Sequence, residues 1–202
     1  MGISERKQRE KEFRRTEILD AAERLFFSRS YDDVSMDEIA NEVELNKATL
    51  YLYFRNKEAL FSAIVLRGYT HLNRLYRECA ETGVDGITKI GLMAGAYYRF
   101  NRQYPDYRRA IRYYSSERFS RCDSPGSDEV IAASAESRRL ICSAVRQGID
   151  DGTIRNDLDP LEITLYLMIT FMSILSLEEK WQPVLDSRGI SEEEFARDFL
   201  RF

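Results

Sequence analysis

Residues Val34–Phe61 read VSMDEIANEVELNKATLYLYFRNKEALF, and this stretch decides the fold of the N-terminal quarter of the chain. Ser35 and Glu38 have the spacing of a capping box, which predicts that a short helix begins here. Asn46 and Asn56 can cap two further helices. The stretch therefore predicts two short helices joined by a tight turn and followed by a longer helix, which is the helix-turn-helix pattern.

The second short helix has one apolar and one polar side. Leu50 and Phe54 have the spacing of core residues, so the side chains between them point outward. Hydroxyl groups and an ammonium group on such a surface can reach phosphates and base edges in a major groove. The outward residues are Lys47, Thr49, Tyr51 and Tyr53.

Charge is unevenly distributed around this pattern. The chain has a net charge of −4 and a pI near 5.3, which disfavours nucleic-acid binding when taken alone. However, residues 45–57 contain three bases and no acid, whereas residues 31–44 contain six acids and no base. Phosphates respond mainly to charges within a Debye length of about 8 Å. We expect few phosphate contacts and a log K versus log[salt] slope much shallower than about −10.

The first helix is predicted from Ile18, Ala21, Ala22, Leu25 and Phe26, which share one apolar face. The preceding residues 1–15 hold six Arg or Lys and three Glu. Acidic and basic residues four positions apart in this arm favour a helix, so the arm is expected to extend the first helix. Within it, Arg14 and Arg15 are expected to contact DNA.

The remainder of the sequence is also helical in pattern, which predicts an all-α protein of about nine helices. Further helices are expected to begin near Gly86, Pro105, Asp128, Pro160 and Ser191, the last with a capping box. The predicted loops are Cys122–Ser127, Gly152–Asp159 and Pro183–Gly189.

Several classes of protein are excluded by composition. Three scattered cysteines and one histidine form no metal, disulfide or catalytic pattern, so we expect no enzyme activity, metal or cofactor. The charged N-terminus does not resemble a signal peptide. The apolar run 161–177 includes Glu162 and is shorter than the roughly 20 residues of a membrane span. A cytoplasmic protein without a membrane segment is expected.

The stretch ILDAAERLFFSRSYDDVSMDEIANEVELNKATLYLYFRNKEALF (18–61) resembles the TetR family of transcriptional regulators, and GTIRNDLDP (152–160) resembles it more weakly. The resemblance implies a three-helix DNA-binding domain and a larger helical domain that dimerises and binds a small molecule. We place these domains at residues 1–55 and 56–202. The residues it assigns to DNA binding are Ser35, Asn46, Lys47, Thr49, Tyr51, Tyr53 and Lys57.

This sequence departs from the family at three positions where glycine is common, namely Ser30, Glu44 and Ala48. Ser30 lacks the ease with which glycine adopts the left-handed conformation at a helix end. Glu44 lies in the turn and is expected to carry a strain cost. The methyl group of Ala48 lies on the DNA-facing side and is expected to contact DNA, for example a thymine methyl.

The larger domain is expected to supply a ligand pocket and a dimer interface. Aromatic and methionine side chains give adaptable apolar walls, and those we assign to the pocket are Met93, Tyr97, Phe100, Tyr113, Met168 and Met172. The helix from Pro160 is apolar on all sides, which favours a second chain as its partner. The expected interface residues are Leu161, Leu165, Ile169, Phe195 and Phe199.

Together these features predict a homodimeric repressor that a small, largely apolar or aromatic ligand releases from a palindromic operator in double-stranded DNA. A helical small-molecule-binding or adaptor protein with a vestigial DNA-binding head is the alternative. The bases Lys47, Arg55 and Lys57, without neighbouring acids, favour the regulator.

Overall fold

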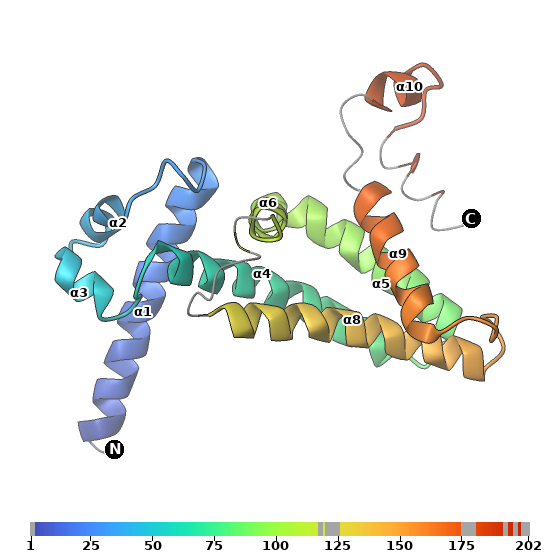
Figure 1. Cartoon of the computed structure of the whole chain (residues 1–202), viewed down its shortest axis with the longest axis horizontal. Helices are drawn as coiled ribbons and strands as arrows, with labels where there is room; N and C mark the ends of the chain where they lie inside the picture. Colours follow the sequence, from blue (N-terminus) through green and yellow to red (C-terminus); the bar gives the residue numbers. More distant parts are fainter. Residues whose placement is uncertain are drawn as a thin grey trace. The chain divides into compact units, whose positions relative to one another are not determined.

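The computed structural model describes residues 3–116, 119, 126–174, 181–191, 194–195 and 198, and it confirms the all-α class. Within these residues there are nine helices and no strand (Figure 1). The helices are α1 (Ile3–Ser28), α2 (Met36–Glu42), α3 (Lys47–Tyr51), α4 (Lys57–Ala80), α5 (Gly86–Gln103), α6 (Pro105–Tyr114), α8 (Ser127–Asp150), α9 (Pro160–Ile174) and α10 (Gln182–Asp186).

The chain packs as two compact units. The head unit comprises Met1–Gly68 and Asp106–Ala132, and the second unit comprises Tyr69–Pro105 and Ala133–Phe202. This grouping by packing differs from the functional division that we placed at residue 55, because it joins α6 to the N-terminal helices. The functional division stays a prediction.

The head unit is built around the apolar face of α1. Ile18, Ala21, Ala22 and Phe26 are buried, as their spacing predicted. Beside them lies an aromatic cluster in which the ring of Tyr31 is 5.6 Å from that of Phe26 and 4.9 Å from that of Phe61. Since such rings bury large apolar areas, the cluster stabilises the packing of α1, α2 and α3.

Helix α6 adds to this core through both rings and polar groups. The Tyr113 ring lies 5.5 Å from that of Tyr31, and its hydroxyl donates to Asp32 at 3.1 Å. The hydroxyl of Tyr107 donates to Glu23 at 2.8 Å, and burial together with this contact raises the pKa of Tyr107. The same Glu23 carboxylate pairs with Arg67 of α4 at 3.1 Å. These contacts hold α1, α4 and α6 of the head unit together.

The second unit is held by a buried polar contact and a close helix approach. Asn73 of α4 donates to the Ala133 carbonyl at 2.9 Å and accepts from Ser137 of α8 at 2.5 Å. Gly86, at the start of α5, leaves no room for a side chain, because a Cβ there would lie 2.1 Å from the backbone nitrogen of Gly148. The glycine pair therefore allows α5 and α8 to meet backbone to backbone.

One predicted loop is wrong and some predictions fall outside the described residues. Pro183–Gly189 was expected to be a loop, but Gln182–Asp186 form α10 with proline in its first turn, where its missing N–H costs no hydrogen bond. The capping box at Ser191 is present, with the Glu194 amide donating to the serine hydroxyl at 3.2 Å. Phe199 and most of the predicted Cys122–Ser127 loop lie outside the described residues.

None of the helices in the described residues combines the length and the apolar character that crossing a membrane requires.

Candidate nucleic-acid interface

The helix-turn-helix begins with the predicted capping box. The hydroxyl of Ser35 accepts from the Glu38 amide at 3.2 Å, and the Glu38 carboxylate accepts from the Ser35 amide at 2.8 Å. Arg29 also donates to this carboxylate at 2.8 Å. The hydrogen bond from Arg29 and those from Ser35 lower the pKa of Glu38 to about 2. The cap that starts α2 therefore stays ionised and intact well into the acidic range.

The turn between α2 and α3 is a Schellman motif with Glu44 at its left-handed position. The Leu45 amide donates to the Ala40 carbonyl at 2.8 Å, and the Glu44 amide donates to Asn41 at 3.1 Å. Glu44 has a φ of 53°, whereas no other non-glycine residue in the described part of the chain, Ser30 included, has a positive φ. Glu44 therefore adopts the left-handed conformation in this turn, and its strain cost stays a prediction.

Helix α3 is anchored on one side and exposed on the other. The Asn46 carboxamide caps it by accepting from the Thr49 amide at 2.8 Å and from the Thr49 hydroxyl at 2.9 Å. Leu50 is fully buried, whereas Tyr51 keeps 42% of its surface exposed. Lys47 and Ala48 are also exposed, so α3 presents an outward face, whereas Thr49, which was also predicted to face outward, is half-buried.

The acids of α2 are largely paired with bases from other parts of the head unit. Lys47 Nζ lies 2.8 Å from Asp37 Oδ1, and the hydrogen bond to this carboxylate raises the pKa of Lys47. Arg24 lies 3.3 Å from Glu42, and Arg29 pairs with Glu38 as described above. These pairs reduce the negative charge of α2 beside the exposed face of α3. Sequence reasoning missed the pairing because it joins residues from separate elements.

Lys57 is held inside the head unit. Its ammonium group donates to the carbonyls of Tyr31 at 2.8 Å and Val34 at 2.7 Å, and it lies 4.3 Å from the centroid of the Tyr31 ring. Lysine is unfavourable at the first position of a helix, where the dipole is positive. These carbonyls explain its presence there, because it ties α4 to the loop before α2. Contact of Lys57 with phosphate stays a prediction.

The other predicted DNA contacts lie around α3. Ser35 and Arg14 are exposed, Tyr53 is half-buried, and the Arg15 guanidinium lies 4.8 Å from the ring centroid of Phe54. Leu52 was not singled out, although it is 78% exposed. Its position midway between Leu50 and Phe54, both of which face the core, could have revealed it.

The residues assigned to the ligand pocket are divided between the two units. Met93 and Phe100 are buried in the second unit, Tyr97 and Met168 are half-buried there, and Met172 is exposed. Tyr113 belongs to the aromatic cluster of the head unit. The assignment of these six residues to a ligand stays a prediction.

Asn101 is a buried polar residue that sequence reasoning missed. It lies on α5 four residues after Tyr97, and its amide donates to the Tyr97 carbonyl at 2.7 Å. Its Oδ1 atom has no hydrogen-bond partner among the described residues. A buried acceptor of this kind is costly to leave unpaired, which makes Asn101 a candidate for reading a donor group on a ligand.

The expected dimer residues form an exposed apolar row on α9. Leu161, Leu165 and Ile169 follow one another at four-residue intervals and are all exposed, with Ile169 at 62%. Tyr166 is exposed beside them, and Phe195 is half-buried. Their contact with a second chain stays a prediction.

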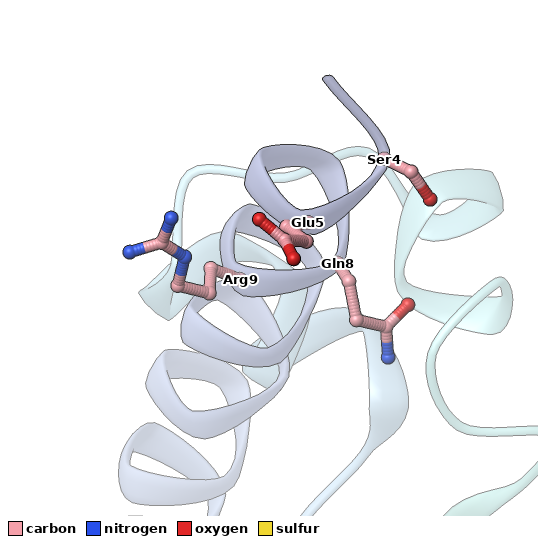
Figure 2. Close-up of a pocket in the computed structure, with 4 residues that line it drawn as sticks. All are labelled: Ser4, Glu5, Gln8 and Arg9. Carbon is pink, nitrogen blue, oxygen red and sulfur yellow. The ribbon is translucent and has the colours of Figure 1, made fainter. Parts of the chain in front are cut away.

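Two further features offer no ligand site. A shallow hollow on α1 is lined by Ser4, Glu5, Gln8 and Arg9, and all four project from the first turns of a single helix (Figure 2). It is largely open to solvent and does not enclose a molecule. The described residues also contain no group of three or more His, Cys, Asp or Glu side chains placed to bind a metal.

Comparison with known proteins identifies relatives of the head and of the fold. Residues 18–64 match the family model of bacterial regulatory proteins of the tetR family. The HTH-type transcriptional repressor KstR2 of Rhodococcus jostii (strain RHA1) is 28% identical over 148 residues, covering 72% of this chain and 70% of that protein.

Two solved structures have the same fold at low identity. AibR in complex with isovaleryl coenzyme A and operator DNA has a TM-score of 0.68 at 20% identity, covering 93% of this chain and 96% of that chain. FadR from Bacillus subtilis in complex with stearoyl-CoA has a TM-score of 0.69 at 15% identity, covering 92% of this chain and 95% of that chain.

Proposed function

Because this chain is a DNA-binding transcriptional regulator of the TetR family, we propose that it acts as a homodimeric repressor on a palindromic operator. The observation that carries the proposal is the geometry of α3. Its N-terminus is capped by Asn46, its inner side is anchored by buried Leu50, and its outer side exposes Lys47 and Tyr51. A short helix held in this way can enter the major groove without rearrangement.

Each exposed group on α3 has a chemical role in this proposal. The Lys47 ammonium exchanges Asp37 for a phosphate or a guanine edge, and the Tyr51 hydroxyl donates to the DNA backbone. Ala48 and Leu52 supply apolar contacts for thymine methyl groups. The ion pairs Arg24–Glu42 and Arg29–Glu38 allow the acidic chain to approach phosphates, because each leaves a neutral pair in place of a free carboxylate.

The exposed row Leu161, Leu165 and Ile169 on α9 supports dimerisation. A contiguous apolar face of this kind is stabilised when a second copy covers it. A symmetric dimer would place two α3 helices about 34–36 Å apart, one turn of DNA, and so read a palindrome.

The second unit supports an effector with a large apolar part. Met93 and Phe100 supply apolar side chains, and Asn101 supplies a buried acceptor for one polar group. Acyl-coenzyme A thioesters are the first class to test, because AibR and FadR of similar fold were solved with such ligands. In this proposal the effector binds better to a state of the dimer with altered α3 spacing, which lowers its DNA affinity.

Fluorescence anisotropy with the DNA upstream of the gene for this protein tests the proposal. Lys47→Ala is expected to weaken binding about tenfold, corresponding to loss of about 1–2 kcal/mol from one charged contact. Arg74→Ala is the matched control, because Arg74 is also an exposed base in an ion pair, with Glu78 at 3.1 Å, but belongs to the second unit. Equal affinities of the two variants would contradict the role of α3.

Sedimentation tests the proposed dimer, and titration with acyl-coenzyme A thioesters tests the proposed effector class. Ile169→Glu is expected to convert the dimer into a monomer, and a wild-type protein that sediments as a monomer would refute the palindromic arrangement. Isovaleryl-CoA and stearoyl-CoA are titrated into the protein–DNA complex, and release of the DNA by either one supports the effector class. If neither isovaleryl-CoA nor stearoyl-CoA releases the DNA, acyl-coenzyme A thioesters are refuted as the effector class.

A further inference from the structure

The N-terminal half of α1 extends beyond the core of the head unit as an exposed helix. Residues 4–14 are all exposed, and the first buried residue is Ile18. Residues 3–17 therefore form an overhang of roughly 22 Å at 1.5 Å per residue. The core of the head unit does not require this extension, so its surface chemistry has to be explained separately.

Four bases of α1 lie close together on one side of the helix. Lys7, Lys11 and Arg15 follow at four-residue intervals and lie in one row, and Arg14 lies beside that row, three residues after Lys11 and seven after Lys7. We call these four residues the basic stripe. Acids flank this stripe, because Glu10 lies three residues after Lys7, Glu12 lies three residues before Arg15, and Glu17 pairs with Arg14 at 2.9 Å.

Arg6, which lies outside the stripe, is ion-paired, whereas the two outermost members of the stripe are not paired in the described part of the chain. Arg6 donates to Glu10 at 2.8 Å, and Arg9 follows Glu5 by four residues. Figure 2 shows Arg9 and Gln8 projecting to different sides of the helix. Within the described residues, neither Lys7 nor Lys11 has a hydrogen-bond or ion-pair partner. Like charges at this spacing repel each other, which costs stability unless an anion compensates.

Arg15, the last residue of the basic stripe, shows which side of α1 the stripe occupies. Arg15 lies over the ring of Phe54, which follows α3 in the chain, at 4.8 Å. The same row then continues through Leu19, which is buried in the head unit. Lys7 and Lys11 are therefore on the side of α1 to which the α3 segment packs, rather than on the side facing away from it.

We propose that the basic stripe binds backbone phosphates of the duplex flanking the base pairs that α3 reads. The inference rests on the proposed function and extends it, because it adds a sequence-independent contact outside the palindrome. Lys7 lies about 12 Å along the helix axis from Arg15, which corresponds to about three or four base pairs. Double-stranded DNA is the occupant that fits, since its phosphates are the anions nearest to a helix beside α3.

Two double variants with equal change in charge test the stripe. Lys7→Gln with Lys11→Gln removes two bases from the stripe, and Arg6→Gln with Arg9→Gln removes two from the opposite face. Each is measured on a duplex ending at the palindrome and on one with about ten additional base pairs on each side. On the longer duplex the stripe variant is expected to bind at least roughly tenfold more weakly at 0.1 M salt, with a salt slope shallower by about 3.6, because the dimer loses four bases.

The control variant is expected to bind both duplexes as the wild type does, and the stripe variant to differ from wild type only on the longer one. Equal losses for both double variants would refute the stripe in favour of a net-charge effect, and no loss for either would refute it outright. Helical content from circular dichroism verifies that all proteins remain folded. The proposed function itself would be refuted by a different result, namely normal operator binding by the Lys47→Ala variant.

Discussion

Replacing Glu44 by glycine is expected to stabilise the head unit. Glu44 occupies the left-handed position of the Schellman motif after α2, with a φ of 53°. A Cβ atom in this conformation crowds the neighbouring carbonyl, whereas glycine adopts it freely. The two hydrogen bonds of the motif are made by backbone groups, so Glu44→Gly preserves both of them.

The expected gain is modest and follows from two opposing quantities. The left-handed conformation costs a non-glycine residue about 1–2 kcal/mol. Glycine is itself destabilising by about 0.5–1 kcal/mol, because it loses more backbone freedom on folding, and this offsets part of the gain. The net stabilisation is therefore about 0.5–1 kcal/mol, which corresponds to a rise in Tm of about 1–4 °C for a chain of this length.

Thermal unfolding followed by circular dichroism measures this shift, and Glu44→Gln separates strain from charge. Glutamine removes the carboxylate but keeps the Cβ, so its Tm is expected to stay close to that of the wild type. Hydrogen exchange at the Leu45 amide, which donates to Ala40 at 2.8 Å, reports locally on the turn and is expected to slow in the glycine variant. A glycine variant no more stable than the glutamine variant would refute the reasoning.

Three other substitutions test the head unit. Lys57→Met should lower the free energy of unfolding by about 2 kcal/mol in urea titrations, because two carbonyls lose a charged donor; an unchanged midpoint would show that these bonds contribute nothing. Asp37→Asn should raise operator affinity roughly twofold to fivefold by releasing Lys47 and removing a carboxylate near phosphate, and weaker binding would contradict this. The pKa of Glu38 is lowered to about 2, so its stabilisation is complete above its ordinary pKa and is lost as the pH falls toward 2. The Tm difference between wild type and Glu38→Gln should therefore shrink between about pH 5 and pH 2, and a constant difference would rule out this linkage.

The sequence predicted the parts of the head that depend on neighbours in the chain. The caps at Ser35, Asn46 and Asn56 each use a side chain three residues from its partner amide, and all three are present. Short-range hydrogen bonding and helical periodicity were sufficient for these caps. The unusual turn at Glu44 was instead expected from the family resemblance, because glycine is common at this position.

Features that depend on tertiary neighbours were not visible in the sequence. The carbonyls that hold Lys57 come from residues 23 and 26 positions earlier, and Asp37 meets Lys47 across the turn. The short helix α10 was expected to be a loop because proline and glycine near its ends resemble a break. The assignment of residues to a ligand pocket stays a prediction, because helical spacing alone does not distinguish an aromatic core side chain from a ligand contact.

The most direct test of the account is whether α3 reads DNA. Purified wild-type protein and Tyr51→Ala are compared by DNase footprinting on the upstream DNA, with sedimentation to verify that both have the same assembly state. The account predicts a symmetric footprint for the wild type and its loss, at matched concentration, for Tyr51→Ala, since Tyr51 is exposed on α3 and contributes little to the core. An unchanged footprint from the folded variant would contradict it.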